Sequence, residues 1–288
     1  MPVALVMAWL QWWPLPVSLQ QQPYASMLLS RDGQLLGARI AADQQWRFAP
    51  PEQVPERYRQ AVLLFEDRRF YQHPGIDPLA IARATWRNLT QGRVTSGGST
   101  LTMQLARLLR QQDYLLQQHA QPPRSFTSKG IEAWRALQLE WRFSKDELLV
   151  HYAAHAPFGG NIVGLQAASW RYFGRAPEQL SWAEAALLAV LPNSPALIHP
   201  GRQRDVLKTK RDRLLRQLHA QNFLSDLDLQ LALLEPLPER PQPLPQHAPH
   251  LLSTVKKMHP QQHFFYSTLD PNYQRIARQI AQSHSARL

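Results

Sequence analysis

Two short segments of this sequence place acidic, hydroxyl and amide residues beside apolar helical patterns. In the first, residues 66–77, Glu66 and Asp67 come at the end of an apolar helical face. A carboxylate in that position can be desolvated enough to raise its pKa, and a general acid or base that works near neutral pH needs such a shift. An acidic pair beside Arg68 and Arg69 is also typical of a surface ion-pair cluster, so both interpretations stay open.

The second segment, residues 97–104, begins with two glycines and continues with hydroxyl and amide side chains. We expect a helix to begin here with Ser99 as its cap, so that free N–H groups and the positive end of the helix dipole face outward. Such an end can bind phosphate oxygens, and Arg107 adds positive charge further along the helix. A Gly-Gly-Ser cap is often only structural, and the segment does not match a Walker loop because no Gly-Lys-Ser/Thr follows.

The two segments together are far more specific than either one alone. Glu-Asp-x-x-Phe-x-x-His-x-Gly-x-Asp, followed about twenty residues later by Gly-Gly-Ser-Thr-Leu-Thr-x-Gln, resembles motifs I and II of glycosyltransferase family 51, the peptidoglycan glycosyltransferases. Residues 156–160, 167–170 and 185–192 resemble the 1C branch of the penicillin-binding proteins within that family. The resemblance extends from about Trp13 to Leu288.

The resemblance implies a mostly α, lysozyme-like domain that polymerises lipid II into glycan strands by inverting transfer, with release of polyprenyl pyrophosphate. It assigns Glu66 as the general base that takes the proton from the acceptor's 4-hydroxyl, which suits an oxocarbenium-like transition state. It also implies that the chain binds lipid II, the nascent glycan strand and phospholipid at the periplasmic face of the bacterial inner membrane. The residues that match substrate-binding positions of motifs I and II are Asp67, Phe70, His73, Ser99, Thr100 and Gln104.

The third motif of the family, normally Arg-Lys-x-x-Glu, reads Ser-Lys-Gly-Ile-Glu at 128–132 and lacks the arginine. Lys129 can neutralise pyrophosphate charge. Glu132, three residues later on the same helical face, can orient that lysine in a catalytic role or hold a divalent cation such as Mg²⁺ or Mn²⁺. Arg107 stands where a lysine is common, which keeps the charge but presents a planar fork.

The fourth motif usually ends Tyr-Leu-Asn, whereas residues 152–154 read Tyr-Ala-Ala. The altered third and fourth motifs support a second hypothesis, in which the chain is a catalytically impaired, truncated homologue that binds lipid II or partner proteins without turnover. Lysozyme-like hydrolysis is a third alternative, because the same two carboxylates could admit water.

Local signals predict where several elements begin. Asp-Gly at 32–33 is a hairpin turn signal inside a region of short alternating runs. A helical pattern begins at Pro55, and Asp77 followed by proline predicts another helix start. Ser144 and Ser181 each precede a glutamate by three residues and fit the capping-box pattern.

Two further segments can each be interpreted in two ways. Met1–Trp13 is apolar except for Gln11. As a helix it would be about 20 Å long, short of the ~30 Å hydrocarbon core, so we interpret it as the remnant of an anchor or as an apolar stub that packs. Residues 202–216 are rich in lysine and arginine, which favours a solvated helix face and leaves an anionic membrane surface as the alternative.

The overall prediction is a mostly α protein: a lysozyme-like glycosyltransferase domain with a small N-terminal β element and a Pro-rich C-terminal connector. The expected parts are a remnant of a membrane anchor (1–17), a short β-containing linker (18–50), the glycosyltransferase domain (51–220), the connector (221–265) and the truncated start of a transpeptidase domain (266–288).

Composition limits the remaining classes of function. Hydrophobic residues are 44% and charged residues 18% of the 288, which excludes a charged disordered chain and a polytopic membrane protein. The absence of cysteine excludes disulfide scaffolds, thiol nucleophiles and zinc ribbons. The excess of 32 basic over 21 acidic residues, a net charge of +11, favours anionic partners, but no nucleic-acid motif accompanies it.

No transpeptidase activity is expected from this sequence. Residues 266–270 resemble only the opening of a penicillin-binding transpeptidase domain. Ser253 and Lys256 fit Ser-x-x-Lys, but no Ser-x-Asn or Lys-Thr-Gly follows, so we interpret the match as chance.

Overall fold

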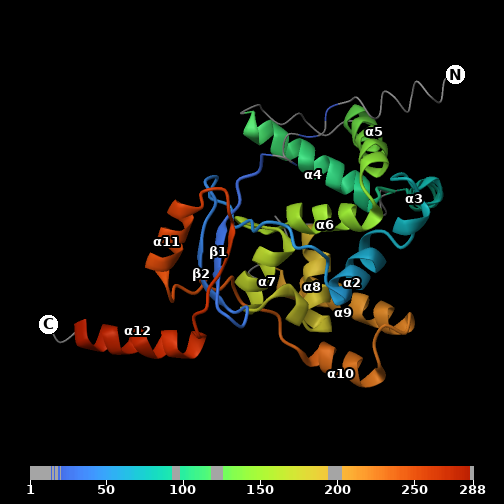
Figure 1. Cartoon of the computed structure of the whole chain (residues 1–288). Coiled ribbons are helices and arrows are strands. Elements are labelled where there is room, and N and C mark those ends of the chain that lie inside the picture. The colour runs from blue at the N-terminus through green and yellow to red at the C-terminus, as the bar shows by residue number, and fades with distance from the viewer. Residues whose placement is uncertain are drawn as a thin grey trace.

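The computed structural model describes residues 14, 16, 19, 21–92, 98–117, 126–193 and 203–285. Over that part the protein is mostly helical, with a small sheet on one side (Figure 1). The mostly α prediction is therefore confirmed. The helices are α2 (Glu56–Glu66), α3 (Pro78–Gln91), α4 (Leu101–Leu116), α5 (Phe126–Arg142), α6 (Lys145–His155), α7 (Leu165–Phe173), α8 (Trp182–Val190), α9 (Arg204–Ala220), α10 (Asp226–Leu234), α11 (Pro249–Met258) and α12 (Pro271–Ser285).

The predicted helix starts lie where the capping signals stand. The Asp77 side chain accepts a hydrogen bond from the Ala80 N–H and caps α3. Ser144 and Ser181 form reciprocal capping boxes with the third residue of α6 and α8. Each cap satisfies backbone N–H groups that the first helical turn leaves without partners, so local chemistry fixes these boundaries.

The predicted cap of α4 is wrong by one residue. Thr100, not Ser99, is the N-cap: its hydroxyl accepts from the Met103 N–H. The same hydroxyl donates to the Gly75 carbonyl at 2.5 Å. The choice between two adjacent hydroxyl residues therefore depends on a contact with a distant turn, which a local capping rule does not contain.

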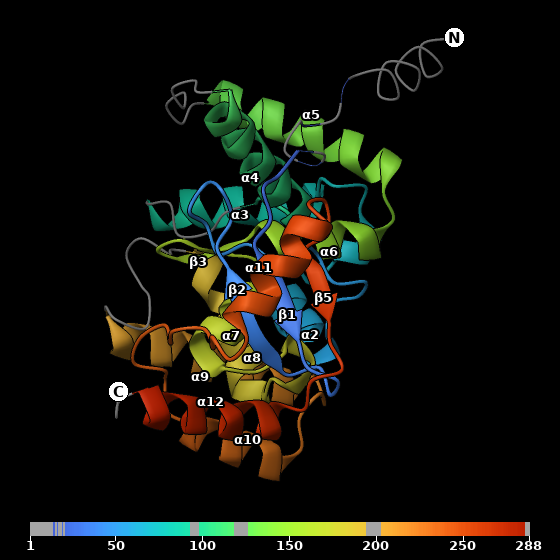
Figure 2. The same cartoon turned by 60° about the vertical axis from the view of Figure 1, so that its left-hand side comes forward.

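The N-terminal β element pairs with a strand near the other end of the chain. β1 (Ser26–Leu29) is antiparallel to β2 (Leu35–Arg39) and parallel to β5 (Phe264–Tyr266), giving the order β2-β1-β5. The predicted Asp-Gly turn joins β1 to β2, with Gly33 at φ 74°. α11 covers one face of this sheet (Figure 2), where Leu28, Leu36, Leu252 and Phe265 form a small buried cluster.

The range predicted as a Pro-rich connector, 221–265, contains two helices, α10 and α11, and most of β5. Most of its prolines lie between α10 and α11, where backbone bonds tie the segment down: the His247 N–H donates to the Leu36 carbonyl at 2.7 Å. A smaller pair of strands, β3 (Pro157–Gly159) and β4 (Ile162–Val163), follows α6.

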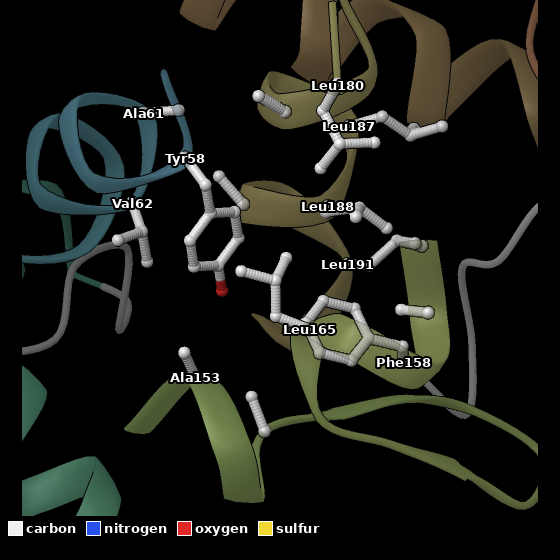
Figure 3. Close-up of a cluster of buried hydrophobic side chains, with 14 of the residues drawn as sticks. Tyr58, Ala61, Val62, Ala153, Phe158, Leu165, Leu180, Leu187, Leu188 and Leu191 are labelled. Carbon is white, nitrogen blue, oxygen red and sulfur yellow. The ribbon is translucent and has the colours of Figure 1, made fainter. Parts of the chain in front are cut away.

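The core is built around α8. Its residues 185–190 are all buried, and α8 packs against both α2 and α9, which also contact each other. A helix that is apolar all round is expected in such a central place. Figure 3 shows Tyr58 of α2 in one cluster with Leu165 and Leu188. Burial of each such side chain stabilises the fold by about 1.5–3 kcal/mol, so α2 is held firmly with its C-terminal end at the edge of the core.

The basic run at 202–216 forms most of α9, and Lys208, Arg213 and Arg216 are exposed as predicted for a solvated face. Arg211 departs from that prediction because its side chain is only 1% exposed. Its guanidinium binds Asp212 and donates to the Glu235 carbonyl at 2.7 Å, which joins α9 to the end of α10.

Among the residues that the structure describes, none of the helices has the length and apolar character needed to cross a membrane. The predicted anchor, Met1–Trp13, lies outside those residues.

A buried histidine makes the fold sensitive to acid. Burial lowers the pKa of His155 from 6.5 to about 4, and the bond of its ring to the His151 carbonyl opposes that shift only in part. The unfolded chain therefore takes up this proton at a higher pH than the folded chain does. The contribution of His155 to the free energy of unfolding is therefore complete above pH 6.5. It falls by about 3 kcal/mol as the pH drops to 4.

The variant His155→Asn removes the titrating ring. Between pH 7 and pH 4, its free energy of unfolding, measured in urea, should fall by about 3 kcal/mol less than that of the unaltered chain. Equal falls in the two proteins would show that His155 does not cause the acid sensitivity.

Candidate active site

Glu66 is the last residue of α2, and the neighbouring helix α4 holds its side chain. The Gln104 amide donates to Glu66 Oε2 at 2.6 Å. Burial raises the pKa of Glu66 above its ordinary 4.5, while the bonds from Gln104 and Asn193 and the charge of Arg107 oppose that shift. The carboxylate is thus desolvated yet held in one orientation, as a general base requires.

Two buried tyrosines lie on the inner side of Glu66. Tyr58 of α2 and Tyr152 of α6 are both 0% exposed. Burial raises the pKa of both hydroxyls, and the Glu66 carboxylate raises it further. Glu66 therefore has an aromatic interior behind it, and this explains why burial dominates its pKa.

Asp67 joins the end of α2 to the beginning of α4. Its carboxylate accepts from the Leu101 N–H at 3.0 Å and contacts His73 Nε2 at 3.0 Å. His73 Nδ1 accepts from the Gly75 N–H at 3.2 Å, so Nε2 is the nitrogen that carries the proton and donates to Asp67. An anionic cap at a helix N-terminus is also favoured by the helix dipole.

The structure brings the predicted residues of motifs I and II together, but in two different settings. Glu66, Ser99 and Gln104 are partly exposed. The side chains of Asp67, Phe70, His73 and Thr100 are buried. Hydrogen bonds of Asp67, His73 and Thr100 position the turn and the beginning of α4, and Asp67 and Thr100 also contribute to the lining of a cleft at this point.

A cleft of about 910 Å³ opens between the end of α2, α3 and the beginning of α4. Glu66 and Ser99 lie on its wall, together with Trp86 of α3. Its basic residues are Arg68, Arg69, Arg83 and Arg87. Arg69 binds Asp77, so the other three supply positive charge beside an apolar ring. Such a lining suits an anionic, amphiphilic ligand.

The structure corrects the predicted pairing in the third motif. Glu132 of α5 is buried, and its ion-pair partner is Arg110 of α4, at 3.3 Å, in place of the expected Lys129. Lys129 is exposed. Gln104 and Arg110 are six residues apart on α4, which corresponds to about 9 Å along the helix axis. The carboxylates of Glu66 and Glu132 therefore bind side chains on different turns of α4.

The residues around Glu132 do not fit the predicted divalent cation. A guanidinium already neutralises this carboxylate, and the part of the chain described by the structure holds no cluster of three or more histidine, aspartate or glutamate side chains. Mg²⁺ is usually bound by one or two carboxylates together with substrate phosphates and water, and the Arg110 guanidinium occupies the one carboxylate predicted for that role.

Ala154, where the fourth motif usually has asparagine, is buried against Gly164. Gly164 has φ +87°, and a Cβ there would lie 2.7 Å from the Ala154 carbonyl oxygen. The segment after α6 thus folds back over this position by backbone contact, which only glycine allows.

Sequence reasoning missed three residues near the site. Arg110 pairs with Glu132, and Lys145 pairs with Glu140 at 2.7 Å. Lys145 stood out only as part of a capping box, and Glu140 and Arg110 lie in ordinary amphipathic helices. The sequence contains no local signal for these pairs because each joins two different helices.

Comparison with known proteins identifies the family. The model of the family described as Transglycosylase matches residues 32–219. Because this match covers more than half of the 288 residues, the chain belongs to the transglycosylase family, the family that its first two motifs resemble.

Its curated relatives are penicillin-binding proteins. The chain is 41% identical to penicillin-binding protein 1C of Escherichia coli over 96% of its own length and 34% of that protein. It is 32% identical to penicillin-binding protein 4 of Bacillus subtilis over 75% of the chain and 33% of the relative. It is 30% identical to penicillin-binding protein 1A of Aquifex aeolicus over 89% of the chain and 35% of that protein. The chain thus spans about a third of the length of these relatives.

Among solved structures, penicillin-binding protein 1A from Haemophilus influenzae aligns with a TM-score of 0.41 and 17% identity, over 83% of this chain and 24% of that one.

Asp67 provides a test of how the site is held together. Asp67→Asn removes a charged acceptor that serves both His73 and the first turn of α4. We expect the free energy of unfolding in urea to fall by about 2–3 kcal/mol. The control Asp32→Asn, at an exposed turn, should change it by less than about 0.5 kcal/mol. Equal effects of the two substitutions would contradict the role of Asp67.

Proposed function

We propose that the chain is a peptidoglycan glycosyltransferase that joins lipid II units into glycan strands, with Glu66 as the general base. The single observation that supports this most is the geometry of Glu66, a desolvated carboxylate held by Gln104 on the wall of an arginine-lined cleft. Membership of the transglycosylase family agrees with that chemistry.

In the proposed reaction, Glu66 takes the proton from the 4-hydroxyl of the acceptor sugar. The oxygen attacks the anomeric carbon of the donor, the bond from that carbon to the diphosphate oxygen breaks, and the configuration inverts. The diphosphate leaves as an anion and needs no proton, so one carboxylate is enough. This agrees with the ion pair of Glu132, because its partner Arg110 lies on a different turn of α4 from Gln104, the residue that binds Glu66.

The cations near Glu66 are proposed to stabilise the departing diphosphate. Arg107 lies close enough to Glu66 to lower its pKa, and Arg83 and Arg87 of α3 line the same cleft. Lys129, exposed at the beginning of α5, can contribute from the side of the third motif. Positive groups placed where negative charge develops lower the barrier of the transfer.

The proposed partners are lipid II, the nascent glycan strand and the phospholipid of the inner membrane, on its periplasmic face. α3 supports a membrane contact because it exposes apolar side chains beside arginines. Trp86 is 70% and Leu89 74% exposed, and Arg83 and Arg87 lie on the same helix. Apolar and basic residues together favour an anionic lipid surface.

Polymerisation of lipid II by the purified chain tests the proposed activity. Glu66→Gln should lower the rate by about 10²- to 10⁴-fold, because the base is removed. The control Glu56→Gln changes an exposed glutamate in the first turn of the same helix and should leave the rate unchanged. Undiminished glycan product from Glu66→Gln would exclude Glu66 as the base.

The same variant should be more stable than the unaltered chain at pH 7. The folded state raises the pKa of Glu66, so ionisation of Glu66 destabilises the fold as the pH rises, and a neutral glutamine avoids that cost. A higher urea midpoint is expected at pH 7, with a smaller difference below pH 4. A lower midpoint at pH 7 would contradict the desolvation of Glu66.

The alternative hypothesis, binding without turnover, makes a different prediction for the same assay. A chain that binds a lipid II analogue but yields no glycan under any condition would support it over catalysis. The observation that supports this alternative is the buried Ala154, at the position where the fourth motif usually has asparagine.

A further inference from the structure

A partly buried ion pair lies on the far side of the turn that follows Glu66. Lys145 Nζ, in the first turn of α6, donates to Glu140 Oε1 of α5 at 2.7 Å. The side chains of Lys145 and Glu140 are 20% and 9% exposed. Thr102 of α4 donates its hydroxyl to the same carboxylate oxygen at 2.5 Å. Three helices, α4, α5 and α6, therefore meet at one carboxylate.

Lys145 also holds the turn that carries His73. Its ammonium donates to the His73 carbonyl at 2.6 Å and lies 4.4 Å from the centre of the Phe70 ring. The same turn also packs tightly against α5. Gly75 has φ +90°, and a Cβ there would lie 2.9 Å from Glu140 Cγ.

A continuous series of hydrogen bonds leads from the Lys145–Glu140 ion pair to Glu66. Held by Lys145, His73 donates to Asp67. Asp67 accepts from the Leu101 N–H and so fixes the beginning of α4 against the end of α2. One turn further along α4, Gln104 donates to Glu66. Glu140 holds α4 independently through Thr102, two residues before Gln104.

We propose that Lys145 and Glu140 are positioning residues for glycosyl transfer: they set the placement of α4 relative to α2, and thereby the bond between Gln104 and Glu66. They touch neither Glu66 nor the lining of the cleft, so they act through the turn and through α4. This inference rests on the proposed function for its kinetic consequence, whereas its structural consequence can be measured without any activity.

The test needs a variant that folds. Lys145→Met alone would leave the carboxylate of Glu140 without its counter-ion, which destabilises strongly. The double variant Lys145→Met with Glu140→Gln removes both charges and keeps an oxygen that can accept from Thr102. It still loses the bond to the His73 carbonyl. Lys208→Met is the matched control, because it breaks a lysine–carboxylate pair of the same length, 2.7 Å, on α9.

The first measurement is amide hydrogen exchange of the turn at 73–75 and of the first turn of α4. The double variant should exchange there at least about tenfold faster than the unaltered chain, because the turn and the cap lose their support. The core helix α8 should keep its protection in both proteins. Unchanged protection at 73–75 and 98–104 would overturn the proposal.

The second measurement is lipid II polymerisation as a function of pH. We expect kcat to fall by about ten- to a hundredfold with little change in KM, since small misplacements of catalytic groups are costly. The acidic limb of the pH profile of kcat should also move to higher pH, because a weaker bond from Gln104 lowers the pKa of Glu66 less. A purely structural pair would lower the amount of active protein and leave the limb in place.

The outcomes separate the two proposals. If the unaltered chain makes no glycan, the proposed function fails, and hydrogen exchange alone decides the positioning role. If the unaltered chain and the Lys208→Met control polymerise equally and the double variant matches both in kcat and in pH profile, the positioning role fails while the proposed function stands.

Discussion

The Asp67 carboxylate is the interaction on which the rest of the site depends. It lies next to Glu66 in the chain, and it binds both His73 and the first N–H of α4. It therefore ties the end of one helix to the beginning of another at the point where Glu66 emerges from the core. That connection sets the placement of Gln104 relative to Glu66 together with the bond of Thr102 to Glu140. The tight packing around Tyr58 and α8 provides the rigid support behind it.

The surroundings of Glu66 combine two opposing effects. Burial against the aromatic interior raises its pKa, while the amide bonds and the charge of Arg107 lower it. Burial has the larger effect, so the carboxylate is more basic than one in water and is still held in one orientation. A group of this kind can accept a proton as a hydroxyl attacks. The second carboxylate of the predicted site, Glu132, is paired with Arg110 on α4.

How far the sequence predicts this structure depends on the range of each contact. Caps such as Asp77 and Ser144 are local, and their helices begin where the residues predict. The two motifs also identify Glu66 and Gln104, which the structure joins. The N-cap of α4 moved from Ser99 to Thr100 because a carbonyl 25 residues away selects the hydroxyl. The partners of Glu132 and Lys145 lie on other helices, so spacing along the chain could not indicate them.

The ionisation of Glu66 in the folded protein is the most direct test of this account. The chain can be labelled with ¹³C at the glutamate carboxyl carbons, and the Glu66 signal can be assigned by its absence in Glu66→Gln. Titration by NMR should then give a pKa above the ordinary 4.5, with an upward change when Gln104 is replaced by alanine. A pKa at or below 4.5 would contradict the account, because Glu66 would then be an ordinary solvated carboxylate.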